Sequence, residues 1–231
     1  MESWLTVERA ADELGLSRER IRAMIRHGLL DATRAGDLWL VDPASVDRRR
    51  QARVRAGRPL TSPHAWAALW LLSNDQQLIE RADAWIQPWD RPRLRRRLAS
   101  ADWPNILPSL RNRAHVRRLR THPSDVARLE QDPRLVRSGT SAARSNGLDI
   151  TAPGVVEGYV RAQDAEDLSD TYLLASSTEP NVVLHVVDYP WPFLPNMTLA
   201  PTILAAVDLA ESDDGRSRRA GLDHLAKVPT R

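Results

Sequence analysis

Apolar positions recur at helical spacing in two short stretches near the start of the chain. The first stretch covers residues 7–14 and stops at Gly15, and the second follows Ser17 and stops at Gly28. Serine is a favoured N-cap residue, and glycine readily takes the left-handed conformation that ends a helix. The pattern therefore predicts two short helices joined by a turn of about three residues, which is the spacing of a helix-turn-helix.

The next segment, LLDATRAGDLWLVD, predicts a hairpin. Gly36-Asp37 separates two short runs that favour strands, and Asp42-Pro43 is a helix cap followed by proline at the first helical position. An arginine-rich helix at 43–56 would then close the unit. Helix, turn, helix, hairpin and helix in this order indicate a winged helix-turn-helix.

The pattern changes twice after this unit. Helical periodicity predicts helices in the middle of the chain, at 62–72, 78–85, 91–100 and 109–120. Short apolar runs then predict strands at 134–139, 148–151, 155–160, 171–175 and 181–188, with helices at 124–130, 164–170, 199–214 and 217–228. We therefore expect an α+β protein with three domains: an N-terminal winged helix-turn-helix at 1–56, a central helical bundle at 57–122, and a C-terminal mixed α/β domain with short strands at 123–231.

Charge separates the chain into a basic and an acidic part. Residues 1–122 hold 23 Arg against 14 Asp and Glu, whereas residues 123–231 hold 10 Arg and Lys against 16 acidic residues. The resulting charges of +9 and −6 give the chain its net charge of +3. A basic part is typical of a surface that binds a polyanion. Because the chain lacks cysteine and its longest apolar run, at 65–72, is too short to span a bilayer, we expect a soluble, cytoplasmic protein with no membrane contact.

The charged residues of the second helix carry the functional prediction. Ile21, Met24 and Ile25 would face the interior of the unit, so that the charged side chains between them would point outward. A recognition helix presents its outer N-terminal residues to bases in the major groove, while neighbouring arginines hold phosphates. The candidate DNA-binding residues are Ser17, Arg18, Glu19, Arg20, Arg22 and Arg26 at this helix, Arg34 near the wing tip, and Arg48 and Arg49 on the third helix. For the third helix, a solvated connector that does not touch DNA is an equal alternative.

The residue types that perform catalysis or bind metals form no recognisable motif. The six histidines include no H-x-H or H-x-x-x-H pair, and the segment 138–147 lacks the pattern of a phosphate loop. Ser138, His122 and Asp125 could be imagined as a catalytic triad, but Asp125 is better explained as a helix cap. Four acidic residues near a predicted helix end fit a solvated terminus better than a metal site: Asp208, Glu211, Asp213 and Asp214. We therefore expect no enzymatic activity, no metal and no cofactor.

The N-terminal features together resemble a known domain. LTVERAADELGLSRERIRAMIRHGLLDATRAGDLWLVDPASV is similar to the DNA-binding domain of excisionase and MerR proteins. The similarity lies in the opening L-T-V-x-x-A-A, the L-G-L-S turn, the R-x-x-I-R-x-G end of the second helix, and a wing with an aromatic residue before D-P. The resemblance implies that a winged helix-turn-helix binds double-stranded DNA.

Later segments resemble a second family. GRPLTSPHAWAALWLL, VRRLRTHPSDVARLEQDPRLVRSGTSAA, GLDITAPGVVEGYV and VDLAESDDGRSRRAGLDHLA are similar to actinobacterial AbiEi-like antitoxins of type IV toxin–antitoxin systems. This resemblance implies a DNA-binding antitoxin that represses its own operon beside a nucleotidyltransferase toxin. The expected partners are the operator DNA, the cognate toxin and a second copy of the chain. The winged domain departs from the wider group, whose other members begin with a different winged helix.

Two other functions stay open at this point. An effector-responsive regulator of the MerR type would use Tyr189, Trp191 and Phe193 as pocket residues, although a structural turn explains them better and no apolar heptad run predicts the coiled coil of that family. An excisionase-like architectural DNA-binding protein would fit the N-terminal domain but leaves the rest of the chain without a role.

Overall fold

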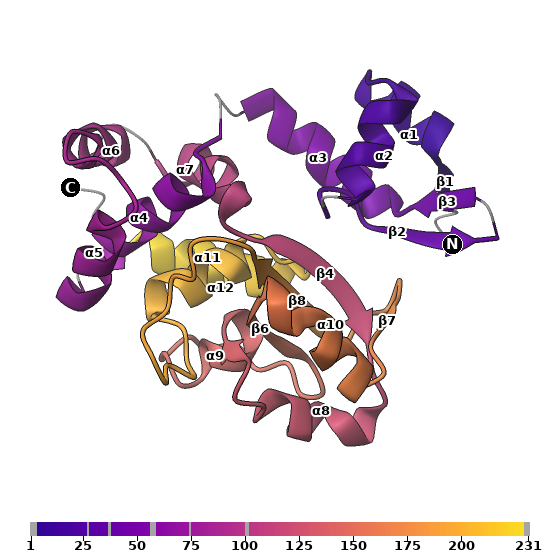
Figure 1. Cartoon of the computed structure of the whole chain (residues 1–231). Helices are drawn as coiled ribbons and strands as arrows, with labels where there is room; N and C mark the ends of the chain where they lie inside the picture. The colour runs from indigo at the N-terminus through magenta and orange to yellow at the C-terminus, as the bar shows by residue number, and fades with distance from the viewer. Residues whose placement is uncertain are drawn as a thin grey trace.

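The computed structural model contains an N-terminal unit with a small sheet of its own and a larger part built around a second sheet (Figure 1). It describes residues 4–26, 28–36, 38–55, 59–73, 75–99 and 102–228. The predicted helix end at His27, the hairpin residue Asp37, and the helix break at Gly57 and Arg58 lie outside the described residues.

The N-terminal unit, residues 4–55, has its elements in the predicted order. These are β1 (Leu5–Thr6), α1 (Val7–Leu14), α2 (Arg18–Arg26), β2 (Ala32–Ala35), β3 (Leu38–Val41) and α3 (Pro43–Arg55). The strands form an antiparallel sheet in the order β1-β3-β2. The apolar stripes of α1 and α2 pack on each other and on Val46 of α3, which gives this unit its own small core. Helix, turn, helix, hairpin and helix are therefore present as the sequence predicts.

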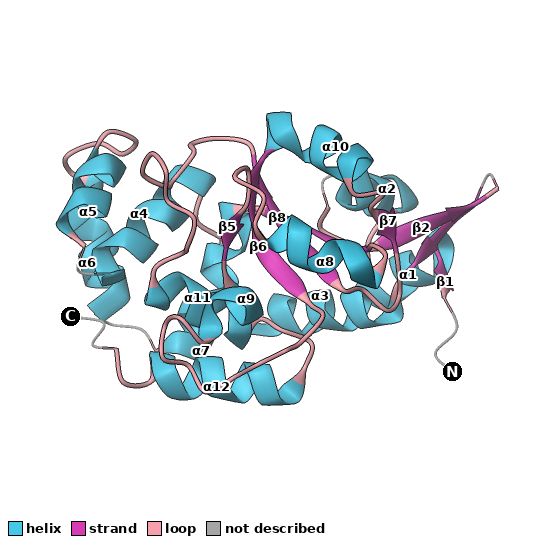
Figure 2. Ribbon diagram, turned by 90° about the horizontal axis from the view of Figure 1, so that it is seen from below, coloured by secondary structure: helices cyan, strands magenta, loops and turns pink. Residues whose placement is uncertain are grey.

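A group of helices follows, of which α4, α5 and α6 lie at the end of the molecule away from the N-terminal unit, whereas α7 lies next to α3 (Figure 2). Its members are α4 (Ser62–Ser73), α5 (Gln76–Asp83), α6 (Asp90–Ala99), α7 (Trp103–Leu110) and the short 3-10 helix η1 (Arg111–Arg113). Helix α4 is apolar on nearly every side and is surrounded by the other elements, with Trp66 and Trp70 fully buried. A helix that is apolar all round is stable only inside a core, and α4 therefore organises this group.

The second sheet has five strands: β4 (His115–Arg120), β5 (Val136–Arg137), β6 (Val156–Arg161), β7 (Ala175–Ser176) and β8 (Val182–Val187). Their order is β5-β6-β8-β4-β7, and only the pairing of β6 with β8 is parallel. Helix α10 (Ala162–Thr171) connects these two parallel strands. The remaining helices are α8 (Pro123–Glu130), α9 (Gly139–Ala143), α11 (Thr202–Ala210) and α12 (Gly215–Leu225). The expected α+β class is confirmed.

Helices cover both faces of this sheet because side chains alternate along each strand. On β8, Val182, Leu184 and Val186 pack with α8 and α10, whereas Val187 joins the core formed with α4, α9, α11 and α12. The core that contains Val187 is separate from the one beside α8 and α10, and its residues range from Ala65 of α4 to Leu225 of α12. The helices that were assigned to a separate central bundle therefore share their core with the C-terminal part of the chain.

Several predicted elements differ from the structure. The predicted helix at 109–120 is wrong, because residues 115–120 form strand β4, which pairs with β8. The segment 148–151 contains no strand, and most of 171–175 belongs to the end of α10 and the turn after it. Helix α7 was not predicted, since Pro104 and Pro108 suggested breaks there. Among the described residues, no helix is long and apolar enough to cross a membrane.

Candidate nucleic-acid interface

Local hydrogen bonds fix the two helices of the helix-turn-helix. The Thr6 hydroxyl accepts a hydrogen bond from the backbone N–H of Arg9, at 3.2 Å, and so caps α1. Gly15 ends α1 with φ at 58°, a conformation that suits glycine. The Ser17 hydroxyl accepts from the backbone N–H of Arg20, also at 3.2 Å, and caps α2. Ser17 therefore sets where α2 begins and which way its first turn faces.

The inner and outer sides of α2 are as the sequence predicts. Ile21 and Met24 are fully buried in the core of the N-terminal unit, and Ile25 packs against it. The charged residues of this helix are exposed on the other side: Arg18, Glu19, Arg20, Arg22 and Arg26. The buried apolar residues thus hold a continuous charged surface toward solvent.

Most of this surface is free to meet a polyanion. Arg18 forms only a long ion pair with Glu8, at 3.5 Å, between two exposed side chains. Among the described residues, Arg20, Arg22 and Arg26 form no ion pair. Hydrogen bonds from its own backbone N–H and from Ser17 lower the pKa of Glu19, which keeps its carboxylate ionised and able to accept hydrogen bonds.

The hairpin of β2 and β3 stands where a wing would be. Gly36 turns the chain at its tip with φ at 61°, and the Arg34 guanidinium donates to the Gly36 carbonyl at 3.2 Å. Arg34 is exposed beside this turn, and Leu38 is exposed at the start of β3. The hairpin therefore presents one cation and one apolar side chain at its tip.

On α3, the predicted DNA contact Arg48 binds carboxylates of the protein itself. Arg48 donates to Asp31 at 2.6 Å, to Asp213 at 2.8 Å, and lies 3.5 Å from Asp42. Arg118 of β4 binds Asp31 and Asp213 as well, at 2.7 and 3.2 Å. We call these five residues the inter-unit network, because they join the N-terminal unit to the rest of the protein. With three carboxylates around it, Arg48 stabilises this junction instead of facing outward, and we remove it from the candidate DNA contacts.

Burial shapes the electrostatics of this network. Burial raises the pKa of Asp31, and the nearby Arg118 and Arg48 only partly oppose that shift. For Arg118, burial would lower the pKa, but Asp31 and Asp213 reverse the effect and raise it. Arg49, the neighbour of Arg48, is half-buried on the same helix. Part of the basic stretch of α3 is therefore taken up by contacts within the protein and does not face solvent freely.

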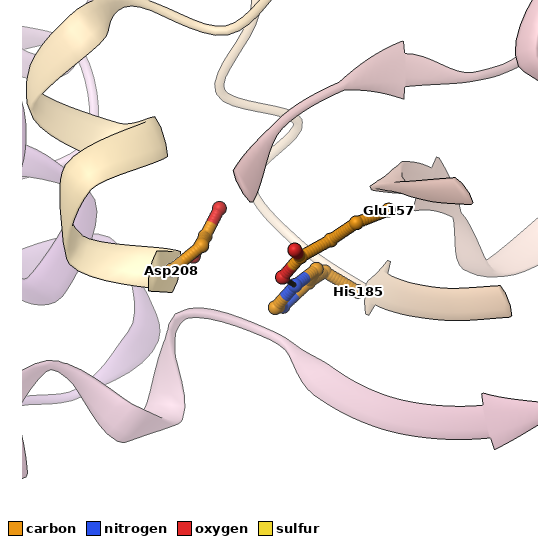
Figure 3. Close-up of side chains that lie close together, drawn as sticks. All are labelled: Glu157, His185 and Asp208. Carbon is orange, nitrogen blue, oxygen red and sulfur yellow. Dashed lines mark hydrogen bonds and ion pairs between the residues drawn. The ribbon is translucent and has the colours of Figure 1, made fainter. Parts of the chain in front are cut away.

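A second cluster of charged residues lies between the second sheet and α11, and of its members only Asp208 was singled out from the sequence. Glu157, His185 and Asp208 are all buried, and they place their potential ligand atoms within 4.8 Å of one another (Figure 3). Arg113 is buried beside them and donates to Asp208 at 2.8 Å. Tyr159 donates to the same carboxylate at 2.7 Å. The five residues come from four elements and meet only in the folded chain.

This cluster is better explained as a structural one than as a metal centre. One oxygen of Asp208 accepts hydrogen bonds from Arg113 and Tyr159, and the other accepts from Ser138. The Glu157 carboxylate accepts from the backbone N–H of Thr140 at 2.9 Å and lies 3.1 Å from the His185 ring. A cation would have to displace these donors and would be repelled by the adjacent guanidinium. The cluster therefore ties α11 to the sheet.

The four acidic residues near the end of α11 have separate roles, so the predicted solvated terminus is wrong for part of this set. Asp208 is in the buried cluster, Glu211 binds Arg113, and Asp213 joins the inter-unit network. Asp214 caps α12 through the backbone N–H of Ser217, which lowers its pKa.

The imagined catalytic triad does not come together. Ser138 donates to Asp208, and His122 accepts from the backbone N–H of Ser124 as the N-cap of α8. Asp125 lies in the first turn of that helix and pairs with Arg128. The three residues therefore serve different local structures. The N-cap of this helix is His122, so the prediction of Asp125 as its cap is wrong.

Two aromatic residues of the DYPWPF segment, Trp191 and Phe193, pack with the core instead of lining a pocket. Phe193 is buried and lies within about 6 Å, centroid to centroid, of Trp66, Trp70 and Trp191. Tyr189 is exposed. The structure instead forms a cleft of about 950 Å³ between the N-terminal unit and the second sheet. The two sides of this cleft include Arg26, Trp39, Arg118 and Ser177.

Comparison with known protein families agrees with this geometry. A family model described as a helix-turn-helix domain matches residues 4–54, which cover the whole N-terminal unit except its last residue. The comparisons with curated proteins and with solved structures give no match. The N-terminal unit is therefore a helix-turn-helix domain, and domains of this kind bind double-stranded DNA.

Proposed function

We propose that the protein is a DNA-binding antitoxin that represses its own toxin–antitoxin operon, in which the toxin is a nucleotidyltransferase. One observation supports the DNA-binding part above all: α2 anchors Ile21 and Met24 inside a helix-turn-helix domain and exposes its arginines on the opposite side. The resemblance of the later segments to AbiEi-like antitoxins supports the operon and the toxin. The N-terminal unit binds the operator, and the rest of the chain acts against the toxin.

The geometry suggests how the operator is bound. The N-terminal half of α2 enters the major groove, where Arg18, Arg20 and Arg22 reach bases and phosphates. Glu19 accepts a hydrogen bond from a cytosine amino group or orients a neighbouring arginine. Arg26 and the hairpin residue Arg34 hold the phosphate backbone on either side of this contact. Two copies on a palindrome would place their α2 helices about 34–36 Å apart, one turn of the duplex.

A mobility-shift assay on the promoter of the protein's own operon tests DNA reading. Replacement of Arg22 by alanine is expected to weaken binding about 5- to 150-fold, since a bidentate arginine–guanine contact contributes about 1–3 kcal/mol. Arg144→Ala is the matched control, because Arg144 is also exposed but lies after α9, outside the N-terminal unit. If the native protein does not shift this promoter, or if both variants bind as the native protein does, the proposed DNA contact is wrong.

Growth measurements test the antitoxin part separately. Expression of the nucleotidyltransferase reading frame beside this gene is expected to arrest growth, and co-expression of the full chain is expected to restore it. The double variant Arg18→Ala/Arg22→Ala should lose repression of the promoter. If the full chain does not relieve the arrest, the toxin assignment fails, while the mobility-shift result still stands.

The cleft favours a second candidate, an effector-responsive regulator. Ligand sites occur preferentially where two units meet, and a volume of about 950 Å³ suits a small molecule. Because Arg26 and Trp39 line it, a bound ligand would contact both α2 and the hairpin. A compound that raises Tm and also changes operator affinity would support this candidate. Compounds that raise Tm without changing operator affinity would contradict it.

A further inference from the structure

A second basic surface lies on α6, far from the helix-turn-helix domain. Leu94 and Leu98 of this helix are buried in the core beside α4. The remaining charged positions after the first turn are all arginine and exposed: Arg93, Arg95, Arg96 and Arg97. Figures 1 and 2 both place α6 and α2 at opposite ends of the molecule. The α6 arginines therefore do not extend the surface of α2.

Three of these arginines, Arg93, Arg95 and Arg96, are not neutralised by the neighbouring acids of the described chain. The nearby carboxylates have other partners: Asp90, at the start of α6, lies 3.2 Å from His64, and Asp83 pairs with Arg91, the first arginine of the helix, at 2.9 Å. Asp102, after the helix, accepts a hydrogen bond from the Asn105 side chain at 2.5 Å. Within the described part of the chain, Arg93, Arg95 and Arg96 have no ion-pair partner. Like charges three or four residues apart on a helix repel each other. A polyanionic ligand would relieve this repulsion.

An exposed tryptophan accompanies the basic helix. Trp89 directly precedes α6 and is 60% exposed, whereas Trp66, Trp70 and Trp103 are buried. Arg93 and Arg96 lie three residues apart on α6 and therefore share one side of the helix, and Trp89 lies in the turn that leads into it. Leu94 and Leu98 lie on the opposite, buried side of the helix. The outer surface thus combines an aromatic ring with a row of guanidinium groups. We call Trp89 with Arg93, Arg95 and Arg96 the α6 surface.

We propose that the α6 surface binds single-stranded nucleic acid. Proteins that bind single strands combine arginines that follow the phosphates with an aromatic ring on which a base stacks. A duplex would leave Trp89 without a partner, because the faces of its bases are already stacked. The row from Trp89 to Arg96 spans about 10 Å along the helix, enough for a few nucleotides. This activity is additional to operator binding and does not depend on it, since the two surfaces share no residue.

Fluorescence anisotropy of a labelled oligothymidylate with the full-length protein tests the proposal. The triple variant Arg93→Gln/Arg95→Gln/Arg96→Gln is expected to weaken binding at least about tenfold at ~50 mM salt, and to reduce the slope of log affinity against log salt by about 2. The matched control Arg144→Gln/Arg216→Gln/Arg219→Gln removes the same charge at other exposed positions and should bind as the native chain does. Equal losses in the two variants would overturn the proposal.

Substitutions of Trp89 test stacking separately from charge. Trp89→Ala is expected to weaken binding about 5- to 150-fold, and Trp89→Phe should retain most of it, because phenylalanine still offers an aromatic face. Since the ring is exposed, both variants should keep the circular dichroism spectrum of the native protein. If Trp89→Ala binds as tightly as the native chain, bases do not stack there and the proposal fails.

One competitor and one variant distinguish single-strand binding at the α6 surface from binding of other acidic ligands and from binding at the operator site. Polyglutamate should not displace the oligothymidylate; equal displacement would mean that the surface fits an acidic protein and would overturn the proposal. The variant Arg18→Ala/Arg22→Ala should still bind the single strand while losing the operator duplex. Loss of both ligands in that variant would assign single-strand binding to α2 instead. Failure of the single-strand proposal therefore leaves the operator assay unaffected.

Discussion

Replacement of Arg118 by glutamine should weaken the junction between the N-terminal unit and the second sheet. The guanidinium binds Asp31 at 2.7 Å, and each of these side chains is only 19% exposed. The second partner, Asp213, is 46% exposed and 3.2 Å away, so that pair contributes less than about 1 kcal/mol. Breaking one partner of a buried pair costs about 3–5 kcal/mol. Because Arg48 continues to bind Asp31, we expect a smaller loss of about 2–3 kcal/mol in the free energy of unfolding.

Urea unfolding followed by tryptophan fluorescence measures this loss. The matched control is Arg120→Gln, two residues along the same strand, whose exposed guanidinium lies 3.6 Å from the Glu179 carboxylate and donates to the Glu179 backbone carbonyl at 2.8 Å. That control should change the free energy of unfolding by less than about 0.5 kcal/mol. An effect of Arg118→Gln as small as the control would refute the reasoning, because the inter-unit network would then contribute nothing beyond surface pairing.

The raised pKa of Asp31 sharpens this prediction. Burial makes the neutral form of Asp31 easier to reach in the folded chain than in the unfolded one. Asp31→Asn, which imitates that neutral form, should therefore cost less than Arg118→Gln. In the Asp31→Asn background, the further change of Arg118 should have little effect, which a double-mutant cycle would report as a coupling of about 2 kcal/mol. A coupling near zero would contradict a direct interaction.

Three further predictions concern single positions. Asp208→Ala removes one of the two carboxylates that bind the buried Arg113, and because Glu211 still binds it, the free energy of unfolding in urea should fall by about 3 kcal/mol, the lower end of the cost of breaking a buried pair. Gly28→Ala should cost about 1 kcal/mol in the same assay, because Gly28 has φ at 62°. The hydrogen bond from Arg134 lowers the pKa of Asp132, so its contribution is present above the ordinary carboxyl pKa and is lost as the pH falls through the lower folded value. The stability difference between wild type and Asp132→Asn should therefore shrink between about pH 5 and pH 3; a difference that stays constant would contradict it.

Local signals explain why the N-terminal unit was predictable. Ser17 and Gly15 act on the residues next to them, and the apolar spacing of α2 identifies its buried side without knowledge of the rest of the fold. The exposed residues of α2 follow directly from that spacing. Their placement needed only the helical period, which is a property of the segment itself.

Contacts between residues far apart in the sequence explain why other predictions were wrong or missing. Residues 115–120 were interpreted as a helix because apolar residues in HVRRLR recur three apart, but β4 is a strand because β8 pairs with it from far along the chain. Arg48 looked like a phosphate contact because its partner Asp213 is 165 residues away in sequence. The cluster around Asp208 has the same origin, since Arg113 reaches it across 95 residues. No local pattern identifies such partners.

These contacts also change the meaning of the charge asymmetry along the chain. Counted by sequence, the basic front part and the acidic back part look like two separate surfaces, but the fold pairs many of their charges with each other. Arg48 and Arg118 bind Asp213, and Arg113 binds Asp208, so each pair joins the front part to the back part. The excess of arginine therefore overstates the basic surface. Within the described residues, two exposed groups of arginines have no ion pair: Arg20, Arg22 and Arg26 on α2, and Arg93, Arg95 and Arg96 on α6. Since burial and internal pairing do not explain these two groups, they are the positions at which substitution should change nucleic-acid binding without changing stability.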